Sequence, residues 1–251
     1  MKKPIDKDKK TVGVIPARMA SSRFYGKPLT RILGKEMLQW VYESCAMSRR
    51  LKEVYVATDH EEIENFCRAR NINCLMTSAD HKNCSERSNE VARRMGADYI
   101  VEIQGDEPTL LPSDIDSFLD EAFGYEEFDV VIQYAEISPE EAKCPHSVKI
   151  AKGSAGQALF FSRSAVPYNF KSRDMKYCKQ IGLYLWKAQS LRRFSELPKC
   201  ELEYIEDTHM LRLVDNGFDV KLVKSPQAVY GVDVPEDVPI AEECLRTRAN
   251  Q

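Results

Sequence analysis

Apolar and amphipathic segments alternate along the first half of the chain, and this alternation predicts its architecture. The apolar segments have the length of strands, and the amphipathic ones have the spacing of helices. Strands that alternate with helices form parallel βαβ units with right-handed crossovers, so we expect a mostly parallel sheet with helices on both faces. Strands are predicted at 11–15, 53–57, 73–76 and 99–103, and helices at 37–47, 61–70, 86–95 and 114–123.

The second half is less regular and richer in predicted strands. Gly153 and Gly156 predict a hairpin between two of these strands. We expect a flexible tail at 1–10, one domain over 11–251, and within it a smaller inserted β-rich or dimerisation subdomain at about 135–200. Strands are predicted at 130–134, 148–150, 158–162, 180–186 and 220–223, and helices at 202–215 and 235–246.

Composition narrows the class of protein. A chain of 251 residues buries roughly three quarters of its unfolded surface, so its core needs no covalent staples. The net charge of -3 argues against nucleic acid as the main partner, because that partner usually requires a strongly basic face. With no apolar run of about 18 residues, we expect no membrane partner. The eight cysteines form no CxxC pair, so we expect free thiols in the cytoplasm.

The loop after the first predicted strand, at 16–28, carries the first candidate chemistry. It contains the cations Arg18, Arg23 and Lys27, together with Gly26. In open α/β sheets ligands bind beyond the carboxyl ends of strands, so these cations are placed to hold the phosphates of a nucleotide. Composition alone leaves a solvated basic loop equally open. The loop is neither a Walker A motif nor a dinucleotide fingerprint.

Carboxylates follow two other predicted strand ends. Asp106 and Glu107 come directly after the strand at 99–103, and Asp233 precedes a helix that begins with proline. Mg²⁺ prefers one or two carboxylates together with phosphate oxygens, so Asp106 and Asp233 could share one ion. The alternatives are an acidic turn at Asp106 and an ordinary helix N-cap at Asp233.

A polar segment at 77–87 follows the strand at 73–76 and leads into a helix. Ser85 is a candidate N-cap for that helix. Arg87 would lie in the first helical turn, where the helix dipole disfavours a cation, which indicates another use for its charge. A plain surface loop remains as open as a binding site.

The motif-bearing segments, in chain order, are 15–18, 21–23, 26–29, 56–59, 76–78, 104–108, 158–163, 167–168, 181–184 and 231–237. As an ordered set they resemble the 3-deoxy-manno-octulosonate cytidylyltransferases, or CMP-Kdo synthetases, along nearly the whole chain. The resemblance implies a Rossmann-like nucleotidyltransferase fold, usually a homodimer. It implies that CMP is transferred from CTP to an acidic sugar, with Mg²⁺ as cofactor and pyrophosphate as product, in the synthesis of lipopolysaccharide or capsule precursors.

The resemblance also implies roles for individual residues. Arg18, Lys27 and Asp106 are the predicted catalytic residues, with Arg18 and Lys27 holding the triphosphate. Asp106 and Asp233 are the predicted metal ligands. The predicted substrate-binding residues are Ala17, Arg23, Thr77, Ser85, Arg87, Gln104, Gln180 and His209.

Three segments depart from the family pattern. At 83–87 the family reads Ser-Gly-Thr-Asp-Arg, and this chain reads Asn-Cys-Ser-Glu-Arg. Gln180 replaces a histidine, and at 208–212 Leu-Glu-Gln-Leu-Arg is replaced by Thr-His-Met-Leu-Arg. Losing a polar partner to a buried ligand group costs about 1–3 kcal/mol, so these changes bear on the acceptor. The nucleotide and metal positions match the family.

We therefore expect a cytidylyltransferase whose acceptor is Kdo or a Kdo-like acidic sugar. Another anionic acceptor, such as a phosphonate or a modified sugar acid, stays open because the acceptor-side segments differ. A non-catalytic nucleotide-binding protein on the same fold is an alternative of another class. A dinucleotide oxidoreductase is a third option, and the chain has no glycine fingerprint to support it.

Overall fold

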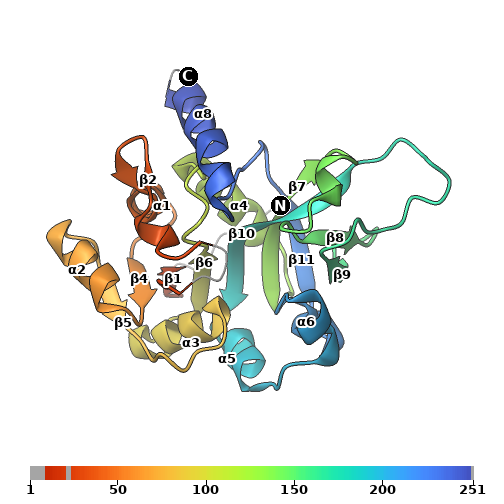
Figure 1. Cartoon of the computed structure of the whole chain (residues 1–251). Helices are drawn as coiled ribbons and strands as arrows, with labels where there is room; N and C mark the ends of the chain where they lie inside the picture. The colour runs from red at the N-terminus through yellow and green to blue at the C-terminus, as the bar shows by residue number, and fades with distance from the viewer. Residues whose placement is uncertain (1–8, 21–23, 250–251) are drawn as a thin grey trace.

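A nine-stranded sheet forms the centre of the protein in the computed structural model, which describes residues 9–20 and 24–249 (Figure 1). The main path of the sheet has the strand order β11-β7-β10-β6-β1-β4-β5. The strands are β1 (Thr11–Pro16), β4 (Val54–Thr58), β5 (Cys74–Met76), β6 (Tyr99–Ile103), β7 (Val130–Ile137), β8 (Lys149–Lys152), β9 (Ala158–Ser162), β10 (Tyr177–Lys187) and β11 (Val220–Lys224), with a separate two-stranded pair of β2 (Arg31–Ile32) and β3 (Lys35–Glu36).

The helices lie between these strands along the chain. They are α1 (Met37–Ala46), α2 (Glu61–Ala69), α3 (Cys84–Met95), α4 (Pro112–Ala122), α5 (Ala188–Glu196), α6 (Glu201–Glu206), α7 (Leu211–Asp215) and α8 (Val238–Ala249), with 3-10 turns η1 (Lys27–Leu29), η2 (Glu141–Lys143) and η3 (Pro235–Asp237).

The predicted parallel sheet is confirmed, with one reversed strand inside it. The neighbours β6, β1, β4 and β5 are parallel, and so are β7 and β11, whereas β10 runs antiparallel to both β6 and β7. The predicted hairpin around Gly153 and Gly156 is also confirmed, because β8 pairs antiparallel with β9. This hairpin lies off the main path and joins the sheet through β8 and β10.

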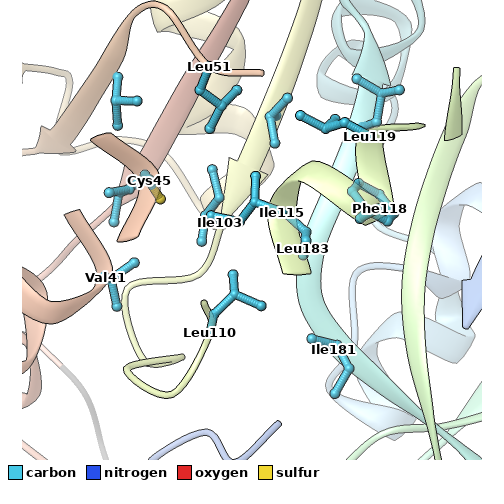
Figure 2. Close-up of a cluster of buried hydrophobic side chains, with 14 of the residues drawn as sticks. Val41, Cys45, Leu51, Ile103, Leu110, Ile115, Phe118, Leu119, Ile181 and Leu183 are labelled. Carbon is cyan, nitrogen blue, oxygen red and sulfur yellow. The ribbon is translucent and has the colours of Figure 1, made fainter. Parts of the chain in front are cut away.

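Alternating side chains of the strands fill two cores, one on each face of the sheet. On β1, Val12 and Val14 belong to the core with α3, α5 and α7, while Ile15 belongs to the core with α1, α2 and α4. Figure 2 shows part of the second core, where Ile103 of β6 lies between Val41 of α1 and Phe118 of α4. Because successive strand residues point to opposite faces, both faces must be covered by helices, as predicted.

The helix predicted at 202–215 is wrong as one element. The structure divides it into α6 and α7, and Asp207 between them adopts a left-handed backbone with φ 46° and ψ 46°. The guanidinium of Arg163 donates to the carbonyl oxygens of Glu206 and Asp207, each at 2.8 Å. These carbonyls at the end of α6 thus bond to a tertiary partner and not to a continuing helix.

Two elements, the helix α5 and the β2–β3 pair, were not predicted from the sequence. The helix α5 buries Leu191 and Phe194, and the β2–β3 pair turns at Leu33 and Gly34, which both have positive φ. The helix predicted at 235–246 is confirmed from residue 238, but its first residues form the 3-10 turn η3. Among the described residues, none of the helices combines the length and apolar character needed to cross a bilayer.

Candidate functional site

A cleft of about 290 Å³ opens where the parallel strands β1 and β6 end side by side. It lies where ligands bind in open α/β sheets. Predicted site residues that line the cleft are Ala17, Arg18, Lys27, Arg87, Gln104, Asp106, His209 and Asp233. The cleft is also lined by Asn83, Cys84, Arg163, Lys199, Glu203 and Asp207, among others.

Three charged side chains from distant segments meet in this cleft, and we call them the carboxylate–lysine cluster: Lys27, Asp106 and Asp233. The Lys27 ammonium donates to Asp106 Oδ2 at 2.6 Å, and Asp233 Oδ1 lies 3.9 Å from the same nitrogen. Lys27 also donates to the carbonyl oxygen of Val232 at 3.0 Å. The predicted pairing of Asp106 and Asp233 thus has a geometric basis, because both carboxylates approach one cation.

The loop after β1 presents the cations predicted to bind phosphates. Gly26 has φ 71°, a left-handed conformation that favours glycine, and it turns the chain into η1 so that Lys27 is the first residue of that turn. Arg18 is exposed and lines the cleft, and the backbone N–H of Ala17 donates to Ala57 at 2.9 Å. The predicted binding residue Arg23 lies outside the described residues.

Gln104 packs very closely against strand β10. Its backbone N–H donates to Gly182 at 2.8 Å, and its side-chain Nε2 donates to Glu102 Oε1 at 2.8 Å. A Cβ atom added at Gly182 would lie 2.6 Å from the Gln104 side chain. Glycine is therefore required in β10 for Gln104 to lie at the cleft.

Glu107, next to Asp106, is buried and turned away from the cleft lining. Its Oε1 accepts a hydrogen bond of 3.0 Å from the backbone N–H of Gly182. Burial, with a further contribution from the Asp106 charge, raises the pKa of Glu107 to about 7. This carboxyl therefore titrates near neutral pH.

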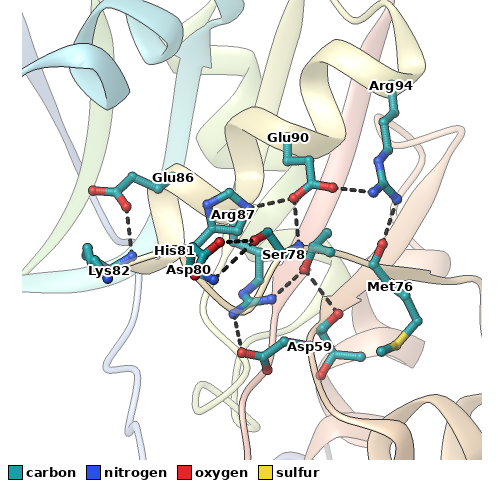
Figure 3. A network of polar contacts seen from close by, with 12 residues as sticks. Asp59, Met76, Ser78, Asp80, His81, Lys82, Glu86, Arg87, Glu90 and Arg94 are labelled. Atoms are coloured by element: carbon teal, nitrogen blue, oxygen red, sulfur yellow. Dashed lines mark hydrogen bonds and ion pairs between the residues drawn. The ribbon is translucent and has the colours of Figure 1, made fainter.

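Arg87 forms contacts outside its own helix, as its unfavourable position in the first turn of α3 indicated. It is buried, and its guanidinium pairs with Asp59 at 2.9 Å (Figure 3). The same guanidinium donates to Thr77 Oγ1. The Thr77 hydroxyl in turn donates to the carbonyl oxygen of Thr58 at 3.0 Å. The guanidinium therefore lines the cleft in a fixed position, and Asp59 balances its charge.

The prediction of Ser85 as the helix N-cap is wrong. The helix α3 begins at Cys84, and the Asn83 side chain caps it by accepting from the Glu86 N–H at 2.9 Å. Ser85 is instead fully buried in the first turn. Its hydroxyl donates to Glu102 Oε1 at 3.2 Å and lies 3.2 Å from His209 Nε2. The asparagine that replaces the family's serine at 83 thus serves the helix.

Three predicted substrate-binding residues lie behind the cleft and not in its lining. Thr77 and Ser85 are buried and contact lining residues, as described above. Gln180 donates from Nε2 to the buried Tyr184 hydroxyl at 2.6 Å. Thr77 and Ser85 thus support the cleft wall through Arg87 and His209, and the roles of all three side chains toward a ligand stay predictions.

A second group, which we call the cysteine–histidine cluster, consists of Cys84, Glu102 and His209. The Cys84 thiol lies 3.7 Å from His209 Nε2, and Glu102 is fully buried beneath both. Burial, strengthened by the nearby Cys84, raises the pKa of Glu102 well above its ordinary range. Burial also lowers the pKa of His209 and raises that of Cys84.

Arg163, Lys199 and Glu203 also line the cleft. They lie around α6, which was predicted incorrectly as part of one helix at 202–215. Arg163 closes the break between α6 and α7, and Glu203 of α6 forms a two-pronged ion pair with the buried Arg212, with both contacts at 2.8 Å. Arg163 lies within a motif segment of the sequence, which is a signal for it. Glu203 and Lys199 had no such signal.

Comparisons with known proteins identify the family to which the chain belongs. A sequence model of the family described as Cytidylyltransferase matches residues 12–223. A 3-deoxy-manno-octulosonate cytidylyltransferase of Acidobacterium capsulatum is 37% identical over 238 residues, covering 94% of this chain and 97% of that protein. A mitochondrial 3-deoxy-manno-octulosonate cytidylyltransferase of Arabidopsis thaliana is 36% identical over 244 residues, covering 95% and 84%.

Solved structures extend the agreement to the fold. A CMP:2-keto-3-deoxy-manno-octonic acid synthetase complexed with CTP superimposes with a TM-score of 0.88 and 34% identity, covering 95% of this chain and 99% of that one. A putative glucose-1-phosphate thymidylyltransferase of Bacillus anthracis shares the fold alone, with a TM-score of 0.67, 14% identity and coverage of 94% and 95%. The predicted nucleotidyltransferase fold is confirmed, and the chain belongs to the cytidylyltransferases, in the family of the 3-deoxy-manno-octulosonate cytidylyltransferases.

Proposed function

We propose that this protein transfers CMP from CTP to 3-deoxy-manno-octulosonate and releases pyrophosphate. The observation that carries the proposal is the convergence of Lys27, Asp106 and Asp233 at the cleft, in a chain whose relatives bear the name of this activity. A structure of one relative, which superimposes over 95% of this chain, is complexed with CTP. The acceptor oxygen attacks the α-phosphorus in line, and the bond to pyrophosphate breaks.

The chain's own residues act by position and charge. Arg18 lies in the loop after β1 and Lys27 in the turn η1, where they bind the triphosphate as a forked donor and a point charge. The buried guanidinium of Arg87, held by its pair with Asp59, lines the same cleft. Donors that are fixed before the reaction stabilise charge on the transferring phosphoryl group without reorganisation, which is where most of the rate enhancement arises.

We also propose that Asp106 and Asp233 hold Mg²⁺. They fit the ion because both offer hard oxygen ligands, both line the cleft, and both lie within 4 Å of the same cationic nitrogen. When bound, Mg²⁺ neutralises charge on the phosphate oxygens. Lys27 then keeps the two carboxylates oriented and presents its remaining donors to the nucleotide.

The acceptor is the part of the proposal with a rival. Cys84, Gln180, His209 and Met210 all depart from the family pattern, and Cys84 and His209 line the cleft. These changes favour, as a second candidate, another anionic acceptor such as a modified sugar acid or a phosphonate. The donor side is the same in both cases.

Pyrophosphate release from CTP, measured with Mg²⁺ and a panel of acceptors, tests the proposal. We expect turnover with 3-deoxy-manno-octulosonate and none without an acceptor. A kcat/KM at least about tenfold higher for a modified sugar acid or a phosphonate, a difference of 1.4 kcal/mol, would favour the second candidate. Absence of turnover with every acceptor, although CTP binds, would favour the non-catalytic alternative.

Three further expectations remain predictions. The resemblance implies a homodimer, which sedimentation velocity would measure. It also implies phosphate binding by Arg23, and the composition implies a cytoplasmic location. The inserted subdomain at about 135–200, which contains the β8–β9 hairpin, is the segment we propose for dimer contacts.

A further inference from the structure

The cysteine–histidine cluster brings together three types of metal-ligating side chain from three elements. Cys84 is the first residue of α3, Glu102 lies on β6, and His209 lies between α6 and α7. One ligand atom of each, a sulfur, a nitrogen and an oxygen, lies within 4.8 Å of the other two. The cluster shares no residue with the carboxylate–lysine cluster.

The spacing of these atoms suits a tetrahedral zinc ion. Zinc–sulfur bonds of about 2.3 Å and zinc–nitrogen bonds of about 2.0 Å at a tetrahedral angle place the two ligand atoms about 3.5 Å apart. The distance from Cys84 Sγ to His209 Nε2 is 3.7 Å. Ligation therefore requires little movement of either side chain.

Glu102 adds an independent observation that points to a ligand. Its carboxyl group is fully buried, and Oε1 accepts hydrogen bonds from Ser85 and Gln104. Its other oxygen, Oε2, accepts no hydrogen bond from any residue in 9–20 and 24–249. Buried polar atoms without a partner are costly, and hydrogen bonds to one oxygen are the usual support of a carboxylate that ligates a metal through the other.

The charges around the cysteine–histidine cluster are compatible with a bound cation. A thiolate and a carboxylate together carry the charge that a divalent ion balances. The nearby cation Arg212 pairs with Glu203 at 2.8 Å and with Glu86 at 3.5 Å, so its charge is already compensated. Burying the carboxylate beside a thiolate is unfavourable without a further positive charge.

We propose that Cys84, Glu102 and His209 bind one zinc ion, with a fourth coordination position open to the cleft. Three protein ligands with one open position are the arrangement of zinc sites that bind a substrate or water. We place the open coordination position toward the cleft because Cys84, His209 and Gln104 all line the cleft. Resting on the proposed function, we assign this position to an oxygen atom of the acceptor.

The site is a property of this chain and not of the family pattern. Where the family reads glycine, this chain has Cys84, and where it reads glutamate, this chain has His209. These two substitutions lie 125 positions apart in the sequence, yet the structure places their side chains in contact. The two replacements bring a thiol and an imidazole into contact, and these are the ligands that a site for a soft metal ion requires.

Zinc content tests the proposal without nucleotide or acceptor. The full chain is loaded with zinc, dialysed and measured by mass spectrometry, and cobalt is then substituted to record the thiolate-to-cobalt charge-transfer band. We expect one zinc per chain and that band in the wild type. Cys84→Ser and His209→Ala should each weaken zinc binding by at least about 100-fold.

Matched variants separate this site from other thiols and from unfolding. Cys144→Ser, at an exposed cysteine, and Cys74→Ser, beside Cys67, should keep the zinc and the cobalt band. The proposal is overturned if the wild type binds no zinc, if Cys84→Ser binds it unchanged, or if the loss occurs in Cys74→Ser. Circular dichroism checks the fold, and the cobalt spectrum of the wild type decides the matter even where a variant unfolds. Failure of CMP transfer would leave these measurements unaffected.

Discussion

The two clusters contribute to one cleft, but they are built in opposite ways. In the carboxylate–lysine cluster, the side chains of Asp106 and Asp233 are 31% and 36% exposed, and opposite charges meet in contact with solvent. In the cysteine–histidine cluster, Glu102 is completely buried and its partners are neutral or acidic groups. One region therefore carries paired charges near water, and the other carries an unbalanced polar group away from it.

This difference indicates how each region treats a ligand. The Lys27 pairs are only partly buried, so water reaches both carboxylates, and the ammonium can add phosphate contacts while it holds them. Buried polar groups are held rigidly, and their unmet hydrogen bonds select a specific partner. We infer that the first region provides charge for the reaction and the second provides selectivity.

The largest expected effect concerns Arg212, a buried cation near the cysteine–histidine cluster. Arg212→Met leaves Glu203 buried without its two-pronged partner, which should lower the free energy of unfolding by about 3–5 kcal/mol. Urea unfolding measures it. Arg192→Met, which removes an exposed pair with Glu196, should cost about 0–1 kcal/mol. Equal losses in the two variants would contradict the view that burial distinguishes the regions.

The next effect concerns the first region alone. Asp106→Ala removes a carboxylate that orients Lys27 and the proposed Mg²⁺, so kcat/KM for CMP transfer should fall by about 10²–10³-fold. The thermal midpoint should change little, because Asp106 is partly exposed. Asp174→Ala, at an exposed carboxylate in the loop before β10, should keep full activity. Wild-type turnover in Asp106→Ala would remove Asp106 from the proposed catalytic residues.

The third prediction tests Glu107, a buried group adjacent to the partly exposed carboxylate–lysine cluster. Its pKa of about 7 lies above the ordinary 4.5, so its contribution to stability is full below pH 4.5 and is lost as the pH rises through about 7. The loss should approach about 3 kcal/mol. Glu107→Gln removes this titration, so stability curves of the two proteins should diverge between pH 5 and about 8. Parallel curves would show that Glu107 is not buried as described.

Local patterns predicted most elements, because a strand or helix that covers a core must repeat its apolar residues at a fixed period. The strands at 99–103 and 158–162 have the predicted bounds, and Gly26 and Lys27 occupy the turn and cleft positions that the loop indicated. The loop's cations and the carboxylates after β6 were visible because functional groups in such folds follow strand ends.

Tertiary contacts decided the rest. Arg163 ends α6 from a distant strand, and no pattern within 202–215 contains that information. Asn83, and not Ser85, caps α3 because Ser85 is taken inward by Glu102 and His209.

By itself, the sequence determined the parallel sheet, the family, and the cations and carboxylates that line the cleft, because periodic burial and strand-end motifs are local properties. The meeting of Cys84, Glu102 and His209 was decided by the tertiary structure alone. Those residues belong to a helix, a strand and a turn that come together when α3 and α7 pack on one face of the sheet that contains β6. Contact between residues far apart in the chain depends on that packing and on no local pattern.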